Sequence, residues 1–146
     1  VALAIVQGLA ATVRDESFLT PFRFAASLML GEGALLMGGP LTSLVVGVLV
    51  NLSLGAAFGA AYGVLNASFG YESRHRRLRQ TLIACLFALA LWAFNYHVIA
   101  RVLFPWFLAS PPAFQVIVHV LGFGVPLGLF YAGAECRAPR LWDVYA

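Results

Sequence analysis

Five polar side chains interrupt the apolar runs of this sequence and are the residues best equipped for chemistry. They are amides and imidazoles: Asn51, Asn95, His97, Gln115 and His119. Polar groups among apolar residues need partners, so we expect these side chains to face one another inside a helical bundle. Three interpretations stay open: hydrogen bonds between helices, a path for a proton, ion or small solute, or a haem or metal held by the two histidines.

Other chemistry is poorly represented. The sequence has no C-x-x-C-H motif, no P-loop and no GxGxxG, HExxH or GxSxG motif, and Cys85 and Cys136 lack metal-binding spacing. Among the six acidic residues, only Glu32 lies within an apolar stretch, where it could pair with Arg23 or with the histidines of the outer leaflet. We therefore predict no catalytic residue, no metal and no cofactor, and the protein is not expected to be an enzyme.

Glycines at helical spacing form a second pattern. Residues four apart share one helix face, and small residues there let two helix backbones approach closely. Such a face serves packing within one subunit, or contact with a second copy or a larger membrane complex. The predicted helix-packing residues are Gly47, Gly55, Gly59, Gly63, Gly124 and Gly128.

Composition indicates which elements position these residues. Hydrophobic residues make up 62% of the chain and charged residues 10%, and the mean hydropathy is +0.89. A soluble domain is nearer half apolar and a quarter charged. We therefore predict an all-α membrane helical bundle, with residues 1–146 in one transmembrane domain and the lipid bilayer as its main partner. Nucleic acid is not an expected partner.

The apolar runs predict four transmembrane helices. The run at 1–13 is too short to span alone, and we expect it to be the visible end of a first span. The runs at 41–65, 80–104 and 113–134 are each long enough to span.

Segment 18–37 is harder to assign, because it is apolar but contains Pro21, Arg23 and Glu32. We predict an interfacial helix with the proline in its first turn. A true span is the alternative.

The charges of the connections predict an orientation. Arginines concentrate in the loop 66–79 and in the tail 135–146, so the positive-inside rule places both of these segments, and the N-terminus, in the cytoplasm. On the opposite side, Arg101 and Trp106 are predicted to form an interfacial anchor. Four loop arginines are expected to set the topology and to contact anionic lipid headgroups: Arg74, Arg76, Arg77 and Arg79.

A weak internal repeat links the two halves of the chain. Val48–Asn51 is similar to Val116–His119, and Gly59–Tyr62 and Gly128–Tyr131 follow at nearly equal distances. Both helices would run in the same direction, so any duplication is a parallel one of two helical hairpins. Chance similarity between two Val/Gly-rich spans is the alternative.

These motifs resemble those of a group of small bacterial inner-membrane proteins with no established activity. The group carries an NFY…FPWF…H…FG…G…Y pattern and a PxRxxAAxxLG elbow. The matching residues here are Asn95-Tyr96, Leu103–Phe107, His119, Gly128, Tyr131 and Pro21–Gly31. The resemblance implies a four-span bundle with an elbow, in a bacterial inner membrane. Where the group has a histidine in the second span this chain has Asn51, so a metal pair with His119 would be lost.

The glycine faces and the missing catalytic motifs favour a structural or interaction subunit of the membrane. One alternative is a carrier or channel for a small solute or a proton, which would use the polar cluster in the outer leaflet. A second alternative is a haem-binding electron-transfer protein.

Overall fold

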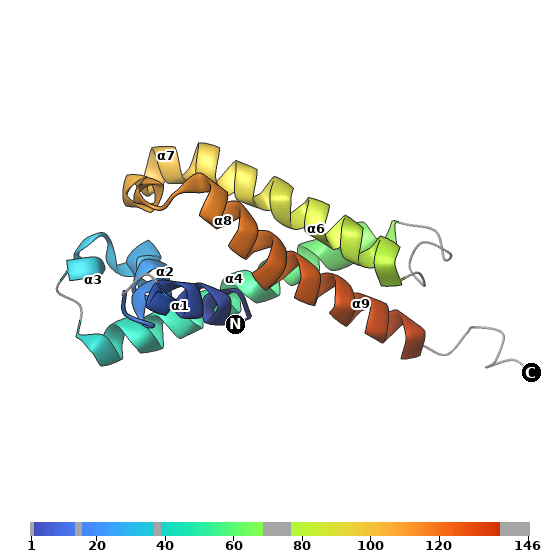
Figure 1. The fold of residues 1–146 in the computed structure, drawn as a ribbon, viewed down its shortest axis with the longest axis horizontal. Coiled ribbons are helices and arrows are strands. Elements are labelled where there is room, and N and C mark those ends of the chain that lie inside the picture. The colour runs from blue at the N-terminus through green and yellow to red at the C-terminus, as the bar shows by residue number, and fades with distance from the viewer. Residues whose placement is uncertain (1, 14–15, 37–38, 69–76, 138–146) are drawn as a thin grey trace, which may run out of the picture.

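The computed structural model describes residues 2–13, 16–36, 39–68 and 77–137, and all regular secondary structure in these ranges is helical (Figure 1). The predicted all-α class is therefore confirmed. Within these ranges, three helices are long and apolar enough to cross a membrane: Leu41–Ala67, Arg77–Leu103 and Pro112–Glu135. They lie over the three long predicted spans and support a membrane protein.

The long helices are built from segments that follow one another almost without a break. The first is the single helix α4 (Pro40–Ala67). The second contains a π-helical turn and comprises α6 (Arg77–Phe94), η1 (Asn95–Ile99) and α7 (Ala100–Leu103). The third also contains a π-helical turn and comprises α8 (Pro112–His119), η3 (Val120–Gly124) and α9 (Val125–Arg137).

Four short helices complete the described fold: α1 (Ala2–Val13), α2 (Thr20–Leu30), α3 (Gly33–Leu36) and the 3₁₀ helix η2 (Pro105–Ala109). Proline stands in the first turn of α2, α4, η2 and α8, where its fixed φ suits a helix start and its missing N–H is not needed. Gly31 ends α2 with φ of 76°, a conformation that only glycine adopts readily.

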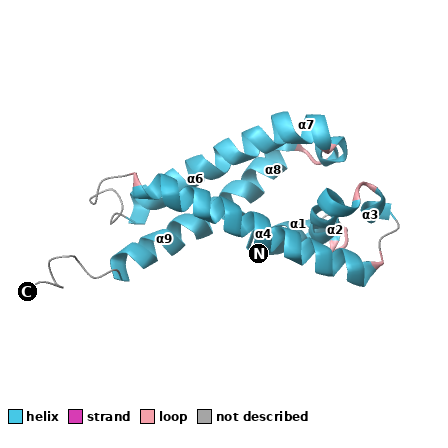
Figure 2. Cartoon of the chain, turned by 180° about the vertical axis from the view of Figure 1, so that it is seen from behind, coloured by secondary structure: helices cyan, strands magenta, loops and turns pink. Residues whose placement is uncertain are grey.

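The helices form two groups that α4 connects (Figures 1 and 2). The second and third long helices form an antiparallel pair. Helices α1, α2 and α3 gather around the N-terminal half of α4, where α2 lies so close that the Phe22 backbone contacts Gly47. Helix α1 also reaches η3, since the Leu3 backbone lies against Gly122.

At the other end of α4, buried polar side chains connect three helices. The hydroxyl of Tyr62 donates to the Gln80 carbonyl at 3.2 Å, and the Gln80 amide donates to Asn66 Oδ1 at 2.6 Å. The Asn66 amide in turn donates to Glu135 Oε1 at 3.3 Å. We call these four residues the polar clamp; it joins the C-terminal ends of α4 and α9 to the N-terminal end of α6.

Candidate functional site

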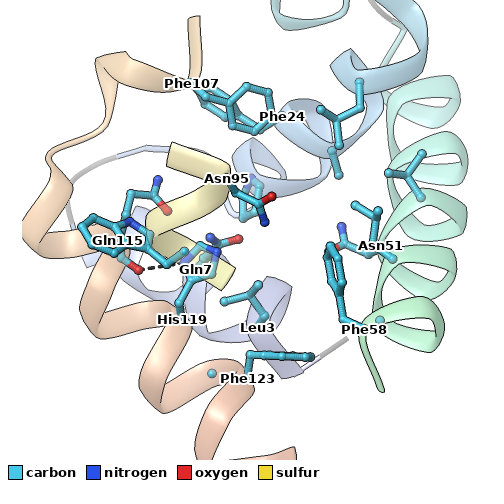
Figure 3. A pocket seen from close by; sticks show the side chains of 18 of the residues that line it. Leu3, Gln7, Phe24, Asn51, Phe58, Asn95, Phe107, Gln115, His119 and Phe123 are labelled. Atoms are coloured by element: carbon cyan, nitrogen blue, oxygen red, sulfur yellow. Dashed lines mark hydrogen bonds between the residues drawn. The ribbon is translucent and has the colours of Figure 1, made fainter. Parts of the chain in front are cut away.

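A cavity of about 1280 Å³ lies between the two groups of helices. The structure brings four of the five predicted polar residues to its wall: Asn51 from α4, Asn95 from η1, and Gln115 and His119 from α8. In Figure 3, Asn51 stands on the α4 side and the other three stand across the cavity from it. Most of the remaining wall is apolar or aromatic.

Local hydrogen bonds orient two of these side chains. The Asn51 amide donates to the Gly47 carbonyl at 3.0 Å, one turn earlier in α4. This bond leaves its second N–H and its oxygen for the cavity. His119 Nδ1 lies 2.8 Å from the Gln115 carbonyl, which can only accept, so Nδ1 carries the hydrogen. In the neutral ring, Nε2 is then an acceptor.

Both π-helical turns lie at cavity residues, since Asn95 begins η1 and His119 directly precedes η3. Wide turns of this kind are rare, often mark functional sites, and change the direction of neighbouring side chains. Pro126 explains the second turn. It has no N–H for the carbonyl of Gly122, and its ring would clash with that carbonyl in a regular α-helix.

Gln7 and Trp92 are among the cavity residues that the sequence predictions missed. Gln7 adds an amide from α1 to the wall (Figure 3). Trp92 lines the wall with its ring stacked on Tyr96 at 5.6 Å, and among the described residues its buried indole N–H has no hydrogen-bond partner. A buried donor without an acceptor is unfavourable, and this nitrogen has almost no surface open to the cavity, so a ligand there would contact the ring of Trp92 and not its N–H. Helical spacing could have predicted Trp92 as a wall residue, because it lies three residues before Asn95 and therefore shares its helix face.

The structure separates the two membrane histidines. His97 is exposed and does not line the cavity that His119 lines. Its ring instead contacts Trp92 and Tyr96, at centroid distances of 5.5 and 5.3 Å. Over the described ranges, no three His, Cys, Asp or Glu side chains are grouped so that they could hold a metal ion. The arrangement therefore lends no support to a metal or haem between the histidines.

Four of the six predicted packing glycines lie in close contacts. At each, an added Cβ would meet another part of the chain: the Phe22 backbone at Gly47, the Tyr131 hydroxyl at Gly63, Cys85 Cα at Gly124 and Thr81 Cα at Gly128. The last two hold the long helices together as an antiparallel pair.

Gly55 and Gly59 differ from the other four. Within the described part of the chain, a Cβ at either position would meet nothing within 4 Å. Gly55 lines the cavity, whereas Gly59 does not. The Gly59 carbonyl accepts a hydrogen bond from the Tyr131 hydroxyl at 2.9 Å, so its backbone is engaged although its face is open.

The predicted anchor and topology residues lie away from the cavity. Trp106 donates its indole N–H to Ser27 Oγ at 2.9 Å and so connects η2 to α2. Arg101 is exposed, as are Arg77 and Arg79 at the start of α6. The predictions for Arg74 and Arg76 lie outside the described residues.

Comparison with known proteins yields no relative. No protein-family model matches the chain, no curated protein matches it, and no solved structure matches it. The resemblance to small inner-membrane proteins stays a prediction, and the class of protein rests on the helices and the cavity.

Proposed function

We propose that this chain is a four-span protein of the bacterial inner membrane that binds a small molecule in its cavity, as a carrier does. The observation that carries the proposal is the convergence of Asn51, Asn95, Gln115 and His119 from three separate segments on one large cavity. Side chains that served only to hold helices together would bond directly to one another. Instead, Asn51 and His119 bond to the backbone of their own helices.

The two ends of the helices also differ as a carrier requires. The polar clamp joins α4, α6 and α9 at one end, and the cavity lies toward the other. A binding site that is closed on one side and open on the other is the resting arrangement of an alternating-access carrier.

The proposed topology has both termini and the loop 66–79 in the cytoplasm, with α2 as an interfacial elbow. The 11 residues of α2 extend about 16 Å at 1.5 Å per residue, against about 30 Å of hydrocarbon. Exposed Arg77 and Arg79 at the start of α6 agree with an inner-side loop. A cysteine at exposed Ala113 should react with an impermeant thiol reagent from outside, whereas one at Arg79 should react only in inverted vesicles. The opposite pattern would overturn this topology.

Two open glycines provide a matched test of ligand binding. Gly55→Leu would place a side chain in the cavity, and Gly59→Leu would add the same atoms on the same helix outside it; a Cβ meets no clash at either position. The protein and both variants are purified from native membranes, and the small molecules that co-purify are identified by mass spectrometry. We expect one molecule to be enriched with the wild type and with Gly59→Leu and depleted with Gly55→Leu.

Circular dichroism and gel filtration check that the variants fold, and Gly55→Ala serves as a milder second variant. The same small-molecule profile from the wild type and from both leucine variants would contradict the binding function.

An interaction subunit is the second candidate, favoured by the open face at Gly59 beside exposed Ala60 and Ala61. Small residues on such a face let a helix of a second copy approach closely. On this hypothesis Gly59→Leu lowers the oligomeric state in mild detergent. An unchanged oligomeric state together with a depleted ligand in Gly55→Leu would leave the carrier as the better assignment.

A further inference from the structure

The charges of the cavity wall restrict what it can hold. Among the described lining residues, Glu16 is the one carboxylate, it already has a partner in the protein, and no arginine lines the wall. Anionic headgroups are bound through charge-assisted hydrogen bonds from arginine or lysine. Burial of an unpaired charge is strongly unfavourable. The cavity therefore suits a neutral molecule.

The polar groups of the wall suit a ligand with acceptors at two ends. Asn51 offers an N–H from the α4 side, and the Asn95 amide offers donors from the other side (Figure 3). A pair of carbonyl oxygens on opposite edges of a ring would accept from both sides. His119 Nε2 adds an acceptor for the hydroxyl of the reduced ligand.

Size and aromatic content indicate the rest of the ligand. The volume of about 1280 Å³ exceeds the roughly 300–1,000 Å³ of typical small-molecule pockets. A flat ring packs well between aromatic side chains, and the remaining volume would accept an apolar tail. The aromatic lining comprises Phe24, Phe58, Trp92, Tyr96, Phe107 and Phe123, among others.

We infer that the ligand is an isoprenoid quinone, with its ring between Asn51 and the Trp92–Asn95 wall and its tail along the phenylalanine-rich part of the cavity. This inference rests on the ligand-binding function proposed above and names the chemical class of the ligand. It requires binding alone and no electron transfer within the chain.

The test is a titration of decylubiquinone into the purified protein in nanodiscs of synthetic phosphatidylcholine, which contain no quinone. Quinones quench indole fluorescence at short range, and Trp92 lies in the wall. We expect saturable quenching and a raised melting temperature. Asn51→Leu and Asn95→Leu each remove a donor and should weaken the affinity by about 10-fold, the equivalent of one net hydrogen bond.

The glycine pair again supplies the control. Gly55→Leu should abolish saturable quenching, and Gly59→Leu should change the affinity less than twofold. A dioleoylglycerol, neutral but without a ring, and oleate, an anion, should not displace the quinone.

The outcomes separate this inference from the proposed function. Quenching that rises linearly and equally in the wild type and Gly55→Leu reports partition into lipid and overturns the quinone assignment. If dioleoylglycerol or another ring-free molecule is the one that Gly55→Leu depletes, the cavity binds a ligand but not a quinone. If no molecule distinguishes Gly55→Leu from the wild type, both proposals fail.

Discussion

The change from glycine to alanine should lower the stability of the fold at Gly128 and raise it slightly at Gly59. Both positions are helical and were predicted from one pattern, yet their surroundings differ. A Cβ at Gly128 would lie 2.5 Å from Thr81 Cα and 3.1 Å from Ala84 Cβ, whereas a Cβ at Gly59 would meet nothing within 4 Å. Because the Thr81 atom belongs to the backbone, no side-chain rotation relieves the contact at Gly128.

The magnitude follows from two opposing effects. Alanine stabilises a helix interior by roughly 0.5–1 kcal/mol relative to glycine. Carbon atoms pack best about 3.5–4.0 Å apart, so α6 and α9 would have to separate by about 1 Å at Gly128. Overpacking of this kind costs about 1–3 kcal/mol. Gly128→Ala should therefore lower the free energy of unfolding by about 1 kcal/mol or more, whereas Gly59→Ala should raise it slightly.

Unfolding in mixed micelles, with dodecyl sulfate as the denaturant and circular dichroism as the signal, measures this free energy for both variants. Gly55→Ala is a second open-site control and should behave like Gly59→Ala. Equal shifts at Gly128 and Gly59, of either sign, would refute the assignment of Gly128 to the contact between α6 and α9.

Three further predictions concern hydrogen bonds between segments. Gln80→Leu leaves Asn66 Oδ1 without its donor and should lower the free energy of unfolding by about 1–2 kcal/mol. In a double-mutant cycle, the variant that carries both Gln80→Leu and Asn66→Leu should lose less than the sum of the two single changes. Trp106→Phe removes the bond to Ser27 and should cost about 1 kcal/mol in the same unfolding assay, with little further loss on adding Ser27→Ala. Tyr131→Phe removes a bond to the α4 backbone and should speed hydrogen exchange at the clamp end of the long helices.

The sequence alone was enough for the helical class and for the three long apolar helices. Uninterrupted apolar runs report length and environment directly, and the proline-led starts of α4 and α8 follow from local backbone chemistry. The sequence left two interpretations of segment 18–37, an interfacial helix and a span, and the structure has α2 and α3 there with Gly31 between them. Gly31 provides the sharp turn, but the orientation of α2 depends on contacts with α4 and η2 that lie far away in sequence.

The cavity was only partly predictable. Their apolar surroundings in the sequence identify Asn51, Asn95, Gln115 and His119 as candidate site residues, because an amide or imidazole in an apolar run needs a polar partner. The same criterion could not separate His97 from His119, since the direction of each ring depends on helical phase. A π-helical turn shifts that phase by about 100° per extra residue, given 3.6 residues per turn.

The face of α4 explains why a cavity exists here. Gly47 at one end packs on the α2 backbone, and Tyr62 and Asn66 at the other end bond to α6 and α9. Between these two attachments lie Asn51 and Gly55, which face open space instead of a neighbouring helix.

A rigid helix that is held at both ends cannot bend to fill its middle, so the gap persists between the attachments. The two attachments also have different chemistry. The contact at Gly47 is backbone against backbone and does not depend on side-chain protonation or on exchange of hydrogen-bond partners. The clamp consists of a few hydrogen bonds whose donors and acceptors can exchange partners, and we infer that it is the end that opens. If the molecule in the cavity is carried across the membrane, its exit lies through the clamp, and a variant with the single change Gln80→Leu should release it faster on the clamp side, which the proposed topology places in the cytoplasm.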